Sequence, residues 1–377
     1  MAEAGPPVPT DWRGWMRWAA SQNWADPDNW RQFTRGWEAL PAQPETPSGG
    51  LELTWRSLTE TEPGVAFAAH WARVGPALER WWRSDGRDAD RESLEEARDQ
   101  LRRHMPELEP AWQALVELAG GGVLAASVLT LWNPPPFLTG CSQAVVPTGG
   151  PALVRNYDWD YRLFDTTVAS TSYLGRAVVG TEDCGWGLLD GVNDAGLAVS
   201  LTFGGRPQVG EGFGIPLVLR YVLQTCDGVD DAIAVLRRVP VHMSYNVTVT
   251  EPSGRVATVY VAPDRPATVT DAPAVTNHQG VVEWRPYCDA IGSETRLTAL
   301  NEALAEGDDV DAVTAALQRA PLYATRFQHG FGTLYTAVAR PDERSMTYHW
   351  PGQPPWTHRL DRPRSDQVVV TLNTSPS

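Results

Sequence analysis

The sequence predicts an α+β fold, in which a layered sandwich follows a mainly helical region. The first observation is that apolar side chains recur every three or four positions over residues 1–120, which is typical of helices. The second is that this period changes to two from about residue 138, which indicates strands. The third is the order of elements: hairpins, then a pair of helices, then further hairpins. This order favours a sandwich over the βαβ alternation of a Rossmann fold.

The helical region carries eleven of the 17 Trp residues of the chain. Helical spacing is clearest over residues 91–105 and around residues 111–120. Residues 41–50 are rich in Pro, Gly and Ser, which predicts a loop or linker. The six Trp at positions 12, 15, 18, 24, 30 and 37 fit either packing anchors or a ligand cage.

Two hairpin signals open the strand region. Residues 141–146 and 152–156 flank a Pro- and Gly-rich turn at residues 147–151. Residues 187–191 and 197–203 flank a second turn, which has the sequence VNDAG.

The rest of the chain alternates between the two periods. Residues 215–238 predict two helices separated at Asp227 and Gly228, and helical spacing returns at residues 294–307 and 309–319. Strands are predicted at residues 245–251, 255–262, 267–276, 332–340, 345–350 and 367–372.

Charge excludes several classes of protein. The chain of 377 residues has 31 basic and 46 acidic side chains, so its formal net charge is −15. This balance argues against nucleic acid and anionic membrane surfaces as partners. All 31 basic residues are Arg, which excludes Schiff-base chemistry on a lysine and phosphate binding by a P-loop lysine.

The four Cys, at positions 141, 184, 226 and 288, have no metal-ligand spacing. We therefore expect neither a metal nor a bound cofactor. No apolar run reaches the roughly 18 residues of a membrane helix, and the first residues lack the pattern of a signal peptide. These features predict a cytoplasmic protein with reduced thiols.

The segment around Cys141 carries the residues best suited to chemistry. Gly140 precedes Cys141 at the start of a predicted strand, and hairpin pairing would hold Arg155 and Asp158 of the next strand beside it. If the Gly140–Cys141 bond were cut, Cys141 would gain an α-amine. Its pKa of roughly 7.7–8 suits a general base at neutral pH. Taken alone, Cys141 is also consistent with a small buried core residue.

Five motifs, in the same order, resemble the acyl-coenzyme A:isopenicillin-N acyltransferase family of self-processing N-terminal-nucleophile hydrolases. They are Gly140-Cys141, Arg155-Asn-Tyr-Asp158-Trp, Gly191-Val-Asn-Asp-Ala-Gly-Leu197, Val275-Thr-Asn277-His278 and Ser293-Glu-Thr-Arg296-Leu. The likeness covers about residues 138–350, and more distantly the chain is similar to bile salt hydrolases, penicillin V acylases and acid ceramidase. The resemblance implies a four-layer αββα sandwich, to which the Trp-rich helical region is an addition.

The resemblance also implies a role for each matching residue. Cys141 would be the nucleophile, first for its own release from Gly140 and then for acyl transfer, and its freed amine would be the general base. Asp158 would orient that amine, and Arg155 would lower the pKa of the thiol. Asn277 would donate a hydrogen bond to the oxyanion.

By charge type, Arg155 and Arg296 would help to bind a substrate carboxylate. Arg296 matches a family arginine near the site. It also suits a helix surface, paired with Glu294 or Asp289. Asp158 and Arg155 likewise suit a purely structural ion pair.

These inferences predict a Cys N-terminal-nucleophile amidohydrolase or acyltransferase. The chain would cleave itself into residues 1–140, a propeptide-like helical fragment that stays associated, and residues 141–377, the catalytic αββα fragment. The substrate would be a small N-acyl amide or peptide attacked through a thioester, with acyl-coenzyme A as a candidate donor. Two alternatives stay open: an uncleaved, inactive precursor-like scaffold, and a small-molecule binding protein that uses the Trp-rich helical layer.

Overall fold

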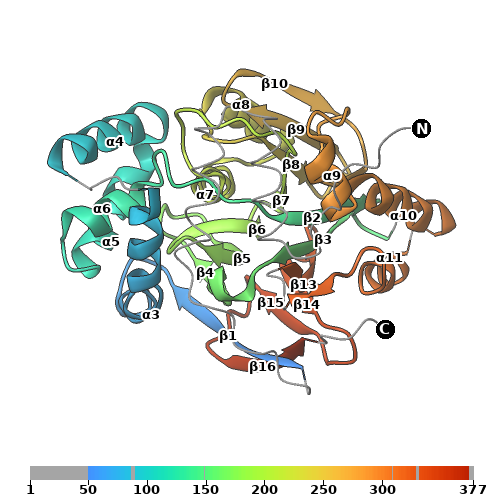
Figure 1. The fold of residues 1–377 in the computed structure, drawn as a ribbon. Helices are drawn as coiled ribbons and strands as arrows, with labels where there is room; N and C mark the ends of the chain where they lie inside the picture. Colours follow the sequence, from blue (N-terminus) through green and yellow to red (C-terminus); the bar gives the residue numbers. More distant parts are fainter. Residues whose placement is uncertain (1–49, 86–89, 148, 308, 328–330, 373–377) are drawn as a thin grey trace.

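The computed structural model describes residues 50–85, 90–147, 149–307, 309–327 and 331–372. They form two β-sheets that pack face to face, with helices on the outer sides (Figure 1). The mixed α+β class is therefore confirmed. The six Trp between positions 12 and 37 and nearly all of the predicted linker lie outside the described residues.

The larger sheet has nine strands in the order β10-β9-β8-β7-β6-β5-β4-β1-β16. Its strands are β1 (Leu51–Glu60), β4 (Thr167–Thr171), β5 (Val178–Asp183), β6 (Gly187–Asn193), β7 (Ala198–Phe203), β8 (Tyr245–Thr250), β9 (Val256–Ala262), β10 (Arg265–Thr270) and β16 (Gln367–Leu372). Every neighbouring pair is antiparallel except β1 and β4, which are parallel.

The smaller sheet has seven strands, six of them in the order β11-β2-β3-β13-β14-β15, and β12 pairs with β13. Its strands are β2 (Gly140–Val146), β3 (Ala152–Trp159), β11 (Ala274–Val275), β12 (Thr325–Arg326), β13 (Phe331–Arg340), β14 (Ser345–His349) and β15 (Trp356–Arg359). The strand predicted at residues 267–276 is divided between the sheets, because β10 ends at Thr270 and β11 joins β2.

Two helices cover the outer face of each sheet. α7 (Ile215–Thr225) and α8 (Val229–Arg238) contact the larger sheet, whereas α10 (Ser293–Glu306) and α11 (Val310–Leu317) contact the smaller one. The short helix α9 (Arg285–Ile291) precedes α10. The layers therefore run helix, sheet, sheet, helix (Figure 1).

This layering explains why β2 and β3 are buried along their whole length. Successive side chains of a strand point to opposite faces. Cys141 and Val145 of β2 accordingly pack in the core between the sheets, whereas Ala144 and Val146 pack in a second core under α10 and α11. The site strands thus have an apolar environment on both faces.

The N-terminal region is mainly helical, but it also contributes a strand. α3 (Val65–Trp82), α4 (Arg91–His104), α5 (Glu109–Leu118) and α6 (Val123–Thr130) pack together at one side of the sandwich (Figure 1). β1, which the sequence analysis missed, lies inside the larger sheet between β4 and β16. Sequence reasoning also missed β4, β5, β12, β15 and α9.

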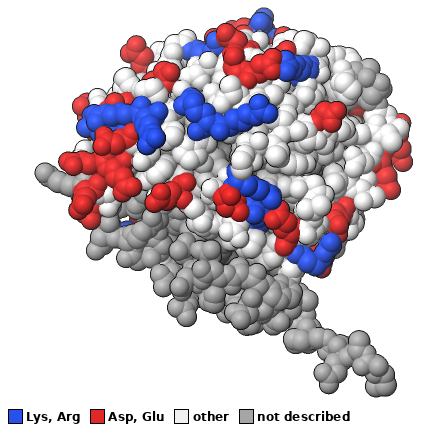
Figure 2. Space-filling view, turned by 90° about the horizontal axis from the view of Figure 1, so that it is seen from above, with Lys and Arg blue, Asp and Glu red and all other residues white. Residues whose placement is uncertain are grey.

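The described surface carries paired charges. Arg255 is paired with Asp230 and Arg285 with Glu294, and Figure 2 shows basic and acidic side chains interspersed on the face seen from above. None of the described helices combines the length and apolar composition that crossing a bilayer requires.

Trp55 joins β1 to the core between the sheets. Its side chain is fully buried, and its ring centroid lies 5.1–5.5 Å from the rings of Phe164, Tyr335, Tyr348 and Trp350. β1 is therefore an integral part of the sandwich rather than an appendage.

Replacing this residue tests that conclusion. Trp55→Ala should lower the free energy of unfolding by about 3–5 kcal/mol, because it leaves a cavity among four aromatic rings. Chemical denaturation followed by circular dichroism measures the loss. Val65→Ala is the control, since Val65 is 86% exposed and its replacement should change the value by less than about 0.5 kcal/mol. Equal losses in the two variants would contradict the conclusion.

Candidate active site

Gly140 and Cys141 open β2 at the edge of the inter-sheet core. In the antiparallel pairing with β3, Gly140 faces Asp158 and Cys141 faces Tyr157. A methyl group at Gly140 would come within 2.5 Å of the Phe331 ring and 3.2 Å of Asp158 Cβ. The absence of a side chain at Gly140 therefore allows these two residues to pack directly against the predicted cleavage bond.

The thiol of Cys141 is buried beside the guanidinium of Arg155. Cys141 is fully buried, its Sγ lies 3.5 Å from Arg155 Nη2, and the hydroxyl of Thr139 lies 3.8 Å away. Burial raises the pKa of this thiol, while the guanidinium of Arg155 opposes the rise. Arg155 thus acts in the predicted direction, but burial is the larger effect, so the thiol of the intact chain is neutral at pH 7.

Arg155 is held in place by residues of the facing sheet and of β13. Its Nη1 donates to Asp190 Oδ2 at 2.6 Å and to the Tyr335 hydroxyl at 2.8 Å. Asp190 also accepts hydrogen bonds from Thr181, at 2.5 Å, and from Tyr335, at 2.7 Å. The ion partner of Arg155 is therefore Asp190, not Asp158.

Asn277 contacts the backbone of Cys141 rather than its thiol. Cys141 N–H donates to Asn277 Oδ1 at 2.9 Å, and Arg296 Nη2 donates to the same oxygen at 2.7 Å. Both groups can only donate, so the orientation of the Asn277 amide is determined. Its nitrogen donates to Phe203 O at 3.0 Å. An oxyanion role would require this amide to change partner, and that role stays a prediction.

Arg296 is a buried residue of α10, with an exposed fraction of 3%. Its Nη1 donates to Cys141 O at 2.7 Å and to Ser142 Oγ at 2.9 Å, and it lies 3.3 Å from Asp158 Oδ2. The alternative of a helix-surface residue paired with Glu294 does not hold, because Glu294 pairs with Arg285. Substrate binding by Arg296 stays a prediction.

The side chains of Asp158 and Arg155 point to opposite faces of β3. Asp158 is fully buried, and its Oδ1 accepts a hydrogen bond from Thr333 at 2.7 Å. Burial raises its pKa, while Arg296 and Thr333 favour the ionised form. Burial is the larger effect, so this carboxyl group takes up a proton more readily than an exposed aspartate does.

The structure thus brings Cys141, Arg155, Asp158, Asn277 and Arg296 together around the Gly140–Cys141 bond. Their catalytic roles stay predictions, but residues separated by up to 155 positions in the sequence meet at one peptide.

Several supporting residues escaped sequence reasoning. Asp190 could have been found, because it is the one charged residue of β6, whose sequence is GLLDGVN. Thr333 and Tyr335 carry no such local signal. Ser293 was also missed as a supporting residue. Its hydroxyl accepts a hydrogen bond from Asn277 N–H and contacts His278 Nδ1, both at 2.9 Å.

A buried group of His70, Asp165 and Glu182 has the residue types of a metal site. His70 Nδ1 lies 3.1 Å from Arg73 Nη2, and its Nε2 lies 2.5 Å from Glu182 Oε1. Because a guanidinium only donates, Nδ1 is the acceptor and the proton lies on Nε2. Metal-bound histidines have the opposite arrangement, in which the second nitrogen donates. The group therefore fits a neutral His70 that donates a hydrogen bond to Glu182 better than it fits a metal site.

Residues 145–354, which are 210 of the 377 residues, match the model of the acyl-coenzyme A:6-aminopenicillanic acid acyl-transferase family. The chain belongs to this family. The family predicted from the five motifs is thereby confirmed. The matched residues include Arg155, Asp158, Asn277 and Arg296, and they begin four positions after Cys141. Membership of this family indicates an acyltransferase or amidohydrolase.

Solved structures similar to this family member include three hydrolases. Conjugated bile acid hydrolase from Clostridium perfringens is 12% identical, with a TM-score of 0.45 over 63% of this chain and 98% of that chain. Penicillin V acylase from Agrobacterium tumefaciens is 14% identical, with a TM-score of 0.42 over 59% and 86%. An N-acylethanolamine-hydrolyzing acid amidase ortholog from Caenorhabditis elegans is 15% identical, with a TM-score of 0.40 over 58% and 98%. No curated protein sequence matches the chain.

The ion pair beneath the thiol can be tested by a substitution that preserves shape. Asp190→Asn leaves the buried Arg155 without its counter-charge, so it should lower the free energy of unfolding by about 3–5 kcal/mol. Urea denaturation measures this value. Asp271→Asn, at an exposed position, is the matched control and should have little effect. An unchanged stability in Asp190→Asn would show that Arg155 does not depend on this carboxylate.

Proposed function

We propose that the chain is a Cys N-terminal-nucleophile enzyme that cleaves its own Gly140–Cys141 bond. It then acts on the C–N bond of a small N-acyl amide or peptide. The observation that carries the proposal is the convergence of Arg155, Asp158 and Asn277 on this one peptide bond. A structural cysteine would not need a buried cation at its sulfur and a buried carboxyl group at the preceding residue.

Self-cleavage would begin at the carbonyl carbon of Gly140. The thiol of Cys141 loses its proton and its sulfur attacks that carbon. The C–N bond then breaks, and the nitrogen takes up a proton and becomes the α-amine of Cys141. Water hydrolyses the resulting thioester, which leaves a carboxylate on Gly140 and a free thiol.

The residues around the bond suit the cleaved enzyme as well. The new α-amine would replace the amide N–H that Asn277 Oδ1 now accepts. Arg155 would favour the thiolate as attack on the substrate carbonyl begins. We assign Asp158 to the amine, because its register partner Gly140 adjoins the nitrogen of Cys141, and Arg296 to holding Asn277 and the Cys141 carbonyl in position.

The layer order supports the αββα sandwich of N-terminal-nucleophile hydrolases, with residues 141–377 as the catalytic fragment. Residues 1–140 would remain associated after cleavage, because β1 is paired with β4 on one side and β16 on the other. α3 adds a hydrogen bond from Arg73 to Thr167 of β4 at 2.7 Å.

Either water or an amine can accept the acyl group from the thioester, which gives hydrolysis or transfer. The family is named for acyl transfer from acyl-coenzyme A, so this donor is a candidate substrate. The constellation needs no metal or bound cofactor for these steps. An uncleaved, inactive precursor is the second candidate, and the complete burial of Cys141 in the intact chain favours it.

Intact mass spectrometry distinguishes these two candidates. The wild type should give fragments of about 15 and 26 kDa by length proportion, because attack by Cys141 splits the chain at residue 140. Cys141→Ala should give only the 41.4 kDa chain. Cys226→Ala, a second buried cysteine, should be cleaved like the wild type. A single uncleaved species in all three proteins would favour the inactive precursor.

Association of the two fragments makes a separate prediction. Under native conditions the fragments of the cleaved protein should elute together in size-exclusion chromatography, because removing β1 would break the larger sheet. They should separate only in denaturant. Separate elution in native buffer would refute the retained propeptide-like fragment.

A further inference from the structure

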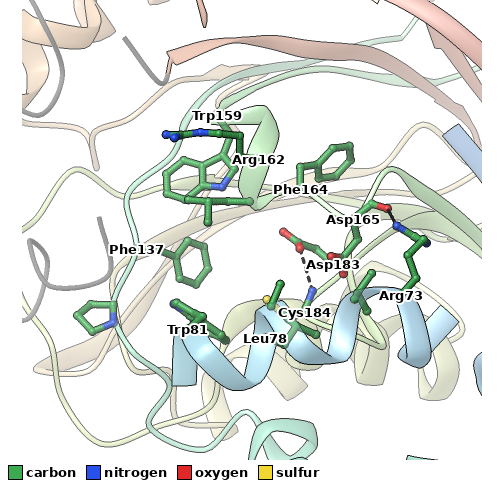
Figure 3. A pocket seen from close by; sticks show the side chains of 14 residues that line it. Arg73, Leu78, Trp81, Phe137, Trp159, Arg162, Phe164, Asp165, Asp183 and Cys184 are labelled. Atoms are coloured by element: carbon green, nitrogen blue, oxygen red, sulfur yellow. Dashed lines mark hydrogen bonds between the residues drawn. The ribbon is translucent and has the colours of Figure 1, made fainter. Parts of the chain in front are cut away.

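A pocket of about 220 Å³ lies between α3, the segment that follows β3, and the turn after β5. Its walls include the aromatic rings of Trp81, Phe137, Trp159 and Phe164 (Figure 3). Trp81 and Phe137 have ring centroids 6.1 Å apart, and Phe137 and Trp159 5.9 Å apart. The pocket is therefore mainly aromatic, and it is lined by none of the residues assigned above to catalysis.

Two buried carboxyl groups interrupt these apolar walls. Asp183 and Asp165 line the pocket and are only 5% and 7% exposed. Asp183 Oδ1 accepts from Cys184 N–H at 2.8 Å, and Asp165 Oδ2 accepts from Gly185 N–H at 3.3 Å. Within the described chain, neither carboxylate forms an ion pair. Figure 3 shows the carboxyl group of Asp183 pointing toward the space between Phe137 and Phe164.

The nearby cations are already bound to other acceptors. Arg73 donates to Asp165 O at 2.9 Å and to Thr167 Oγ1 at 2.7 Å, and Figure 3 shows its guanidinium directed away from the rings. Arg162 pairs with Asp160.

His70 is the remaining basic residue near the pocket, and its Nε2 lies against Glu182 Oε1. Arg73 and Arg162 also line the pocket, but neither forms an ion pair with Asp183.

We propose that this pocket binds a small organic ammonium ion, that is, a protonated amine on a compact apolar or aromatic body. A buried carboxylate without a counter-ion is costly, and a ligand cation would offset that cost. The faces of aromatic rings also attract cations, and the apolar body would fill the rest of the cavity. A neutral ligand gives no such compensation, and an anion would be repelled by the ionised carboxylates.

The pocket is separated from the proposed nucleophile by one aromatic side chain. Tyr157 faces Cys141 in the β2–β3 pairing, and its ring centroid lies 5.7 Å from that of Phe164 in the pocket wall. Its phenol interacts electrostatically with both Asp183 and Cys141. On this basis, and resting on the proposed function, the ligand is the ammonium-bearing end of the substrate. The substrate class is then an N-acyl amide with a free amino group.

Titration of the carboxyl groups supports this assignment. Burial raises the pKa of Asp165 to about 6, and burial together with Asp165 raises that of Asp183. A bound cation favours the ionised carboxylates and lowers both pKa values. Binding should therefore release protons, and apparent affinity should increase as the pH rises through about 6, where Asp165 ionises, while the ligand amine stays protonated.

The experiment uses the full-length Cys141→Ala protein, which keeps the intact chain and cannot turn over substrate. Isothermal titration calorimetry compares phenethylamine, which is an ammonium ion at neutral pH, with 2-phenylethanol and phenylacetate. We expect phenethylamine to bind at least about tenfold more tightly than the alcohol, with an enthalpy that depends on the buffer because protons are released. Phenylacetate should not bind. Equal affinity for the amine and the alcohol would overturn the proposal, and this comparison requires no further variant.

Asp183→Asn in the same background locates the site. It preserves shape and the acceptor for Cys184 N–H, but it should weaken phenethylamine binding about 10- to 100-fold. Asp271→Asn is the control and should leave binding unchanged. Undiminished affinity in Asp183→Asn would place the amine elsewhere. Because binding is measured without turnover, failure of the pocket proposal is distinguishable from failure of self-cleavage, which the mass spectrum reports.

Discussion

The register of β2 against β3 is the constraint on which the rest of the site depends. It places Gly140 opposite Asp158 and Cys141 opposite Tyr157. Because side chains alternate along a strand, the same register directs the Cys141 thiol into the core between the sheets and Ser142 toward α10. A slip of one residue would exchange these faces and separate the thiol from Arg155. The steric fit of Gly140 beneath Phe331 excludes a side chain at this position and supports the same alignment.

Two buried guanidinium groups then hold the site from opposite sides of the smaller sheet. Arg155 reaches across the inter-sheet core to Asp190 of the larger sheet, and Arg296 reaches from α10 to the backbone of Cys141. A buried charge is costly unless it is paired and hydrogen-bonded, and both groups meet this condition. The resulting network ties three of the four layers to one peptide bond. It also explains why Asn277 has a determined orientation, since two donors converge on its oxygen.

Much of the fold and of the residue set could be predicted from local patterns. Period-two segments identified β2, β3, β6 and β7, and helical spacing identified α7, α8, α10 and α11, because each pattern reflects a face buried on one side or both. β1 was missed because it lies within a region that was read as mainly helical. The partners of Arg155 and Asp158 were missed for another reason: Tyr335 and Thr333 lie at least 175 positions away, and nothing in a local sequence encodes that distance.

The sequence by itself determined the class of fold, the family, the candidate nucleophile with its preceding glycine, and the exclusion of lysine chemistry. These follow from residue types, short spacings and periodicity, which are local properties. Only the tertiary structure decided that Asp190 is the ion partner of Arg155, that Asn277 presents its oxygen to Cys141, and that β1 is built into the larger sheet. It also decided that Asp183 faces an aromatic pocket without a counter-ion. Each of these depends on contacts between distant segments, and such contacts exist only once the layers have packed.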